Sequence, residues 1–118
     1  MATDYTKLPT PAFVYVDFCL VPLGTGTPSC AEEVAEVQRV LDANKVDYKL
    51  HSAGTTVEGP WEDVMRAIGQ AHEAILQRGV VRIQTSMRVG ARTDKIQRWK
   101  EKIDRVEDLL AKDSKESK

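Results

Sequence analysis

The chain alternates between short apolar runs and amphipathic stretches, and the period of each predicts its element. Residues 12–23, AFVYVDFCLVPL, are rich in β-branched and aromatic side chains over the length of a strand, which indicates a buried strand. Residues 46–51 alternate apolar and polar side chains, which predicts a half-buried strand. A turn at residues 53–54 lets residues 55–58 return as the second strand of a hairpin. A last strand is expected over residues 80–89.

Two segments between these strands follow helical spacing. The first helix is expected to end near Asn44, and Ser29 with Glu32 forms the sequence pattern of a capping box at its start. The second is expected to begin at Pro60, because proline is tolerated at the first helical position, and to stop at Gly79. Both helices should therefore connect strands.

A third helix is expected after the last strand, over residues 93–112. Thr93 is its expected N-cap, and Asp94 is placed for the positive end of the helix dipole. An apolar seam at spacings of three and four follows from Ile96, Trp99, Ile103, Val106 and Leu110. This seam packs either on its own sheet or against another copy of the chain, and the spacing leaves both open.

The order of these elements is β-α-β-β-α-β with an additional C-terminal helix, which predicts an α+β, ferredoxin-like sandwich. We expect a flexible leader over residues 1–11, a single domain over 12–112 and a polar tail over 113–118. Two helices cover only one face of such a sheet. A partner subunit or a ligand must then cover the other face, which carries Asp17, Cys19, Lys49, His51, Arg82, Gln84 and Arg88.

Composition narrows the classes of partner. With 42% apolar and 30% charged residues the chain has the balance of a folded domain, and its net charge of -1 gives no field that attracts nucleic acid. No apolar run approaches the roughly 20 residues that span a bilayer, and the start lacks the pattern of a secretory signal. We expect a cytoplasmic protein without a nucleic-acid or membrane partner. The cysteines and histidines lack metal-ligand spacing, so no metal is expected.

Polar chemistry gathers in residues 51–61, HSAGTTVEGPW, which hold an imidazole, three hydroxyls, a carboxylate and an indole. One interpretation is structural: Glu58 favours the start of the second helix, and Trp61 packs as its entry staple. The other makes Thr55, Thr56 and Glu58 a polar cluster beside an aromatic plate, which suits a flat heterocyclic cation. The spacing alone leaves both interpretations open.

Three segments resemble the signatures of a known family. VDFCLVPLGTG, LHSAGTTVEGPWEDV and RIQTSMRVGARTDK are similar, in this order, to those of the thiamine-binding protein family, related to the MTH1187 and YkoF-like proteins and formerly the uncharacterised family UPF0045. The resemblance covers roughly residues 13–110, and Ala91 departs from it where threonine is expected. It implies a ferredoxin-like fold, dimers joined through their sheets, a homotetramer as a dimer of dimers, and non-catalytic binding of thiamine or its pyrimidine moiety.

The resemblance also implies site residues. The block T-T-V-E-G points to Thr55, Thr56 and Glu58 as ligand contacts, to which we add Trp61 and His51. No catalytic residue, metal or required cofactor is implied, and thiamine is the expected bound ligand. Whether the pocket lies within one subunit or at an interface stays open, as do the roles of Asp17, Arg82 and Arg88.

Two other function classes compete with thiamine binding. The first is a structural oligomer in which the polar cluster serves only assembly. The second is a small enzyme acting on a heterocycle, with His51 and Glu58 as acid and base, although the sequence lacks a nucleophile with a neighbouring base. If thiamine is the ligand, the unphosphorylated vitamin is favoured, because only the arginines of residues 80–92 could hold a phosphate.

Overall fold

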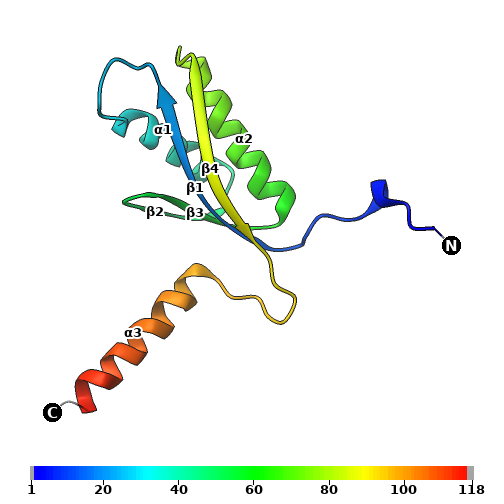
Figure 1. The fold of residues 1–118 in the computed structure, drawn as a ribbon, viewed down its shortest axis with the longest axis vertical. Helices are drawn as coiled ribbons and strands as arrows, with labels where there is room; N and C mark the ends of the chain where they lie inside the picture. Colours follow the sequence, from blue (N-terminus) through cyan, green and yellow to red (C-terminus); the bar gives the residue numbers. More distant parts are fainter. Residues whose placement is uncertain (1, 117–118) are drawn as a thin grey trace.

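A computed structural model describes residues 2–116 as a four-stranded antiparallel sheet with two helices on one face and a third helix extending from its end (Figure 1). The strands are β1 (Val14–Leu23), β2 (Asp47–His51), β3 (Gly54–Gly59) and β4 (Arg82–Gly90), in the order β2-β3-β1-β4. The helices are α1 (Ala31–Ala43), α2 (Trp61–Gln77) and α3 (Trp99–Glu116), and a 3-10 turn lies at Tyr5–Lys7. This arrangement confirms the predicted α+β, ferredoxin-like fold with an additional C-terminal helix.

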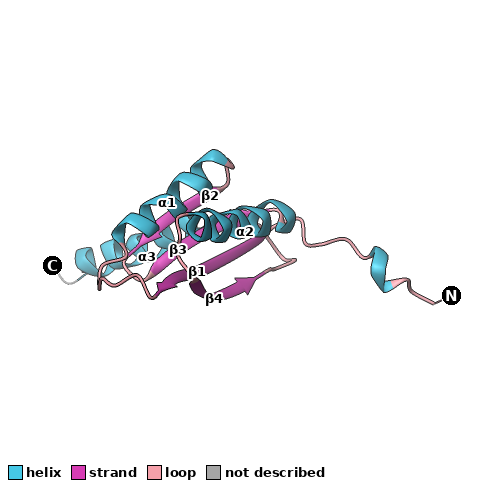
Figure 2. Cartoon of the chain, turned by 90° about the horizontal axis from the view of Figure 1, so that it is seen from above, coloured by secondary structure: helices cyan, strands magenta, loops and turns pink. Residues whose placement is uncertain are grey.

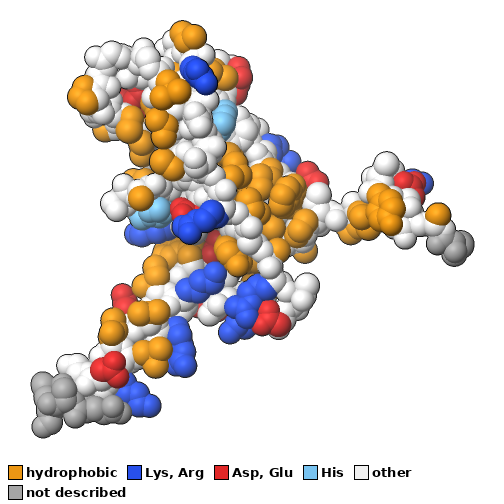
Figure 3. All heavy atoms as spheres, in the orientation of Figure 1, with side chains coloured by type: hydrophobic (Ala, Val, Ile, Leu, Met, Phe, Trp, Pro, Cys, Tyr) orange, Lys and Arg blue, Asp and Glu red, His pale blue; other side chains and the backbone are white. Residues whose placement is uncertain are grey.

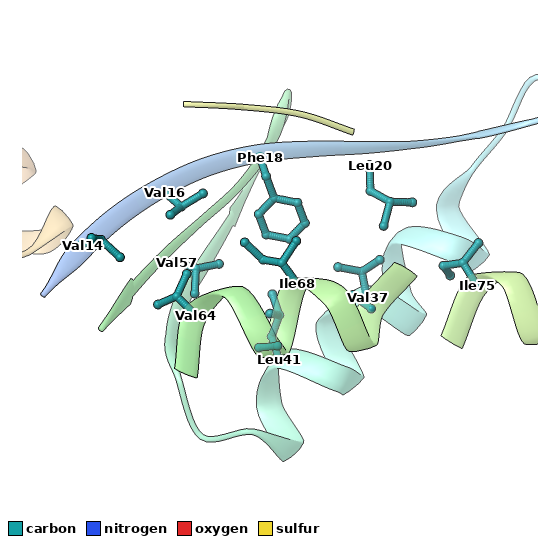
Figure 4. Close-up of a cluster of buried hydrophobic side chains, with 12 residues drawn as sticks. Val14, Val16, Phe18, Leu20, Val37, Leu41, Val57, Val64, Ile68 and Ile75 are labelled. Atoms are coloured by element: carbon teal, nitrogen blue, oxygen red, sulfur yellow. The ribbon is translucent and has the colours of Figure 1, made fainter. Parts of the chain in front are cut away.

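The hydrophobic core lies between the sheet and the helices α1 and α2, which share one face of the sheet in Figure 2. In β1 the buried positions alternate, as the period-two pattern predicted. Figure 4 shows the apolar side chains of β1 meeting those of both helices. The core side chains are Val14, Val16, Phe18, Leu20, Val37, Leu41, Val57, Val64, Ala67, Ile68, Ala71 and Ile75.

The opposite face of the sheet is free of α1 and α2, and strand register decides which side chains lie on it. Tyr15 of β1 pairs with Glu58 of β3 and with Gly90 of β4. Two residues further along β1, Asp17 pairs with Thr56 and with Arg88. Directly paired residues of antiparallel strands share a face, so two polar rows cross this open face.

The predicted helix starts are wrong in detail for α1. Cys30, not Ser29, is the N-cap, and its side chain makes no capping hydrogen bond. Because the helix begins one residue later than expected, the hydroxyl of Ser29 accepts only a long bond, 3.4 Å, from the N–H of Ala31. In α2, Pro60 is the N-cap and Trp61 the first helical residue, which is a shift of one position.

The third helix begins at Trp99, so the predicted start at Thr93 is wrong. Asp94 is instead held in the preceding loop by the guanidinium of Arg92, whose hydrogen bond lowers the pKa of Asp94 to about 2. The helix also continues to Glu116, beyond the predicted end at residue 112. Residue 1 of the expected leader and residues 117–118 of the expected tail lie outside the described residues.

From its start near the sheet, α3 projects away from the sheet (Figure 1). Its apolar side chains are therefore exposed, 55% for Val106 and 61% for Leu110. Of the two alternatives for the apolar seam, the structure does not adopt docking on the chain's own sheet. No helix within residues 2–116 is long and apolar enough to cross a membrane.

Candidate functional site

A pocket of about 550 Å³ lies on the open face, between the sheet and the first turns of α3. In Figure 3, acidic, basic and histidine side chains gather in this region, beside hydrophobic side chains of the helix. Three of the predicted site residues, His51, Thr56 and Glu58, line the pocket. The full lining is Tyr15, Val16, Asp17, His51, Thr56, Glu58, Arg88, Val89, Gly90, Trp99, Lys102 and Ile103.

Glu58 is the buried carboxyl group of this pocket, with only 1% of the residue exposed. Its Oε1 accepts a hydrogen bond from the backbone N–H of Trp99, which fixes the start of α3. Its Oε2 is buried and has no hydrogen-bond partner within residues 2–116. Burial raises the pKa of Glu58 above its usual value, and the hydrogen bond from Trp99 opposes this only in part. An oxygen without a partner can form a hydrogen bond with a ligand that reaches it, as an acceptor when ionised or a donor when protonated.

A change of Glu58 to glutamine should remove a pH-dependent loss of stability. Because the folded-state pKa is raised, the folded protein keeps this proton where the unfolded chain has lost it, so the free energy of unfolding falls as pH rises above 4.5. Glutamine does not titrate. The stability of Glu58→Gln relative to wild type should thus increase from about pH 4 to about pH 7. Urea unfolding at one protein concentration measures this difference, and a difference that stays constant with pH would contradict it.

Two aromatic rings contribute to the apolar part of the pocket. Trp99 is held by its indole Nε1–H, which donates to Oδ1 of Asp47 at 3.3 Å. The ring of Tyr15 packs against Gly90. A Cβ added at Gly90 would stand 2.2 Å from Cε2 of this ring, so any other residue at this position would clash with it. The Nζ of Lys102 sits 3.7 Å from the centre of the Tyr15 ring, in a cation–π contact.

A charged network of Asp17, His51 and Arg88 forms the far side of the pocket. Oδ1 of Asp17 lies 2.9 Å from Nε2 of His51, and Oδ2 accepts from Nη2 of Arg88 at 2.9 Å. The Arg88 hydrogen bond is the main cause of a lowered pKa of Asp17. Because the N–H of Ala53 donates to Nδ1 of His51 at 3.3 Å, the proton of the neutral imidazole is on Nε2 and points to Asp17.

The sequence left open whether Asp17, Arg82 and Arg88 line the pocket. Asp17 and Arg88 line the pocket, whereas Arg82 pairs with Leu23 at the other end of β4 and does not. Among the side chains of residues 2–114, which the structure describes, no group of three or more His, Cys, Asp or Glu could hold a metal ion.

The other two predicted site residues, Thr55 and Trp61, lie elsewhere. Neighbouring residues of a strand point to opposite faces, so Thr55 is buried on the helix side, where its hydroxyl accepts from Nε2 of Gln38 at 3.1 Å. Trp61 packs against the core. Tyr15 was not among the predicted site residues, although its place in β1 puts it on the open face. Trp99 was predicted only as part of the apolar seam and not as a wall of the pocket.

Comparisons with known proteins agree with this fold. The sequence model described as "thiamine-binding protein" matches residues 16–107. The UPF0045 protein ECM15 of Eremothecium gossypii is 47% identical over 96 residues, which cover 81% of this chain and 91% of that protein. The UPF0045 protein sll0230 of Synechocystis is 43% identical over 82% of this chain and 79% of its own length.

Two solved structures show the same fold. The hypothetical protein MJ1052 of Methanocaldococcus jannaschii superposes with a TM-score of 0.73 at 24% identity, over 81% of this chain and 97% of that one. A Thermotoga maritima protein proposed to act in thiamine biosynthesis or salvage gives a TM-score of 0.66 at 19% identity, over 80% and 98%. At these identities the likeness concerns the fold alone.

Proposed function

Because this chain belongs to the thiamine-binding protein family, we propose that its open-face pocket binds thiamine, or the aminopyrimidine part of thiamine, without catalysing a reaction. The observation that carries this proposal is Oε2 of Glu58, a buried oxygen that lacks a partner within the described chain and belongs to a residue that lines the pocket. A buried polar atom without a partner costs about 1–3 kcal/mol, which a ligand that bonds to it would recover.

An aminopyrimidine suits this carboxyl group in either of its protonation states. The exocyclic amine donates to an ionised oxygen, and a ring nitrogen accepts from a protonated one. The rings of Tyr15 and Trp99 offer apolar surface for the flat heterocycle. The pocket volume, about 550 Å³, is in the range of small-molecule sites.

Catalysis by His51 and Glu58 is a weaker reading of the same pocket. Both ring nitrogens of His51 are engaged, one with Asp17 and the other with the N–H of Ala53. An acid–base catalyst needs a nitrogen that exchanges a proton with the substrate. Turnover of thiamine that is lost in His51→Ala would favour the enzyme instead.

Titration calorimetry and thermal shift test the proposed ligand. Thiamine and hydroxymethylpyrimidine should release or absorb heat and raise the melting temperature, since a ligand at 100 times its Kd adds about 2.7 kcal/mol to the free energy of unfolding. The isolated thiazole half of thiamine is the matched control and should have a smaller effect. If neither pyrimidine compound gives heat or a melting shift at millimolar concentration, the proposal is wrong.

The proposal includes self-association in the cytoplasm. The open face and the exposed seam of α3, with Ile103 at the pocket, support a second copy as the cover of this surface. A homotetramer built as a dimer of dimers is the expected form. Sedimentation of the same samples should show a species larger than the 13.2 kDa monomer. An assembly that forms while no ligand binds would favour the structural oligomer.

A further inference from the structure

Two cationic side chains in the pocket keep unused hydrogen-bond donors. The ammonium of Lys102 contacts the Tyr15 ring but has no carboxylate ion pair within the described part of the chain. Arg88 uses Nη2 for Asp17, and its side chain is 88% exposed. A guanidinium has five N–H donors, so most of those on Arg88 remain available to a ligand.

The position of Lys102 also argues against a bare cationic ring in this part of the pocket. The face of an aromatic ring attracts one cation, and the Tyr15 face already has the ammonium 3.7 Å from its centre. A thiazolium placed beside it would meet a like charge. Asp17 offers it little, because Arg88 and His51 already bond to both of its oxygens.

The charges of the residues that line the pocket also argue against a cationic ligand. Lys102 and Arg88 contribute two positive charges, and Asp17 contributes one negative charge. Glu58 adds a second negative charge only when it is ionised. The pocket is therefore neutral or positive by one charge, which favours a ligand that carries an anionic group.

Strand register shows that Lys102 lies nearer to Glu58 than Arg88 does. Glu58, Tyr15 and Gly90 lie in one row across β3, β1 and β4, and Lys102 contacts the middle of this row. Arg88 belongs to the next row, two strands from Glu58, so their Cα atoms are about 12 Å apart from the standard strand and residue spacings. From a pyrimidine at Glu58, a short arm reaches towards Lys102 and a longer arm towards Arg88.

We propose that the ligand carries a phosphate group bound by Lys102 and Arg88, so that the site takes a phosphorylated aminopyrimidine in preference to an unphosphorylated one. This inference rests on the proposed function, and it reverses the preference that the sequence favoured. The two sources of this chemistry are a pyrimidine with a phosphate on its own methyl arm and thiamine phosphorylated on its longer arm. Lys102 binds the phosphate of the phosphorylated pyrimidine. Lys102 and Arg88 together bind the phosphate of phosphorylated thiamine.

The test is calorimetry with five compounds: hydroxymethylpyrimidine, its monophosphate, thiamine, thiamine monophosphate and thiamine diphosphate. Each phosphorylated compound should bind at least about 10-fold tighter than its unphosphorylated parent to the wild-type protein, the value expected for one or two charge-assisted hydrogen bonds. This ratio of affinities should fall towards one in Lys102→Met. In Arg88→Met it should fall for the thiamine phosphates only.

Lys100→Met is the matched control, because Lys100 is an exposed lysine of α3 that does not line the pocket. It should keep the wild-type ratio, which would show that the loss in Lys102→Met is not a general effect of charge on α3. Equal or weaker binding of the phosphorylated compounds by the wild-type protein would overturn the inference while leaving the proposed function standing. If no compound of the five binds, both fall.

Discussion

Replacing Glu58 with leucine should weaken the binding of hydroxymethylpyrimidine or thiamine by about 100-fold, because one hydrogen bond to a buried charged group contributes up to about 3 kcal/mol. Leucine has a similar volume but offers neither an acceptor to the exocyclic amine nor a donor to a ring nitrogen. Calorimetry at neutral pH measures the change in Kd. The effect should be large because the carboxyl group is almost fully buried and its Oε2 has no partner within the described chain.

Two further variants separate ligand contact from folding. Glu58→Gln keeps an oxygen that accepts from the N–H of Trp99, so the start of α3 should persist, and it should lose about 10-fold in affinity because only a donor remains for the ligand. Glu73→Leu changes an exposed glutamate of α2 outside the pocket and should bind as wild type does. Wild-type affinity in both Glu58 variants would remove Glu58 from the site.

The candidate role of Glu58 was predicted from the sequence, but its surroundings were not. The strand predicted over residues 12–23 placed Asp17 on the open face, where it lies, and the predicted hairpin gave a strand that carries Thr56 and Glu58. Local patterns suffice here because strand periodicity is a local property. The same periodicity, had it been applied to the two adjacent threonines, would have separated Thr55 from Thr56.

The walls of the pocket depend on contacts that are distant along the chain. Trp99 starts α3 because its N–H is bonded by Glu58, 41 residues earlier, and no local capping pattern records this. The ring of Tyr15 lies over Gly90, and Lys102 lies over that ring. Such pairs follow from sheet register and from the path of the loop before α3, which hydrophobic spacing does not specify.

Replacing Gly54 with alanine should lower the free energy of unfolding by about 1–3 kcal/mol, as forced overpacking does. An added Cβ would stand 2.6 Å from the carbonyl oxygen of Phe18, which is backbone of the central strand β1 and cannot rotate away. It would also stand 3.5 Å from Cε1 of His51, whose ring passes beside this position to reach Asp17. The clash with Phe18 should therefore disturb the pairing of the hairpin with β1, whereas the distance to His51 is an ordinary contact.

Gly69→Ala supplies the matched control for Gly54→Ala. Gly69 is an exposed residue inside α2 with open space where a Cβ would lie, so alanine should stabilise the protein by about 0.5–1 kcal/mol through its helix propensity. Urea unfolding of both variants at one protein concentration gives the two values, which should have opposite signs. Because the same methyl group is added in both, the difference between them isolates the close approach of β3 to β1. A Gly54→Ala protein as stable as Gly69→Ala would mean that the hairpin does not pass this close to Phe18.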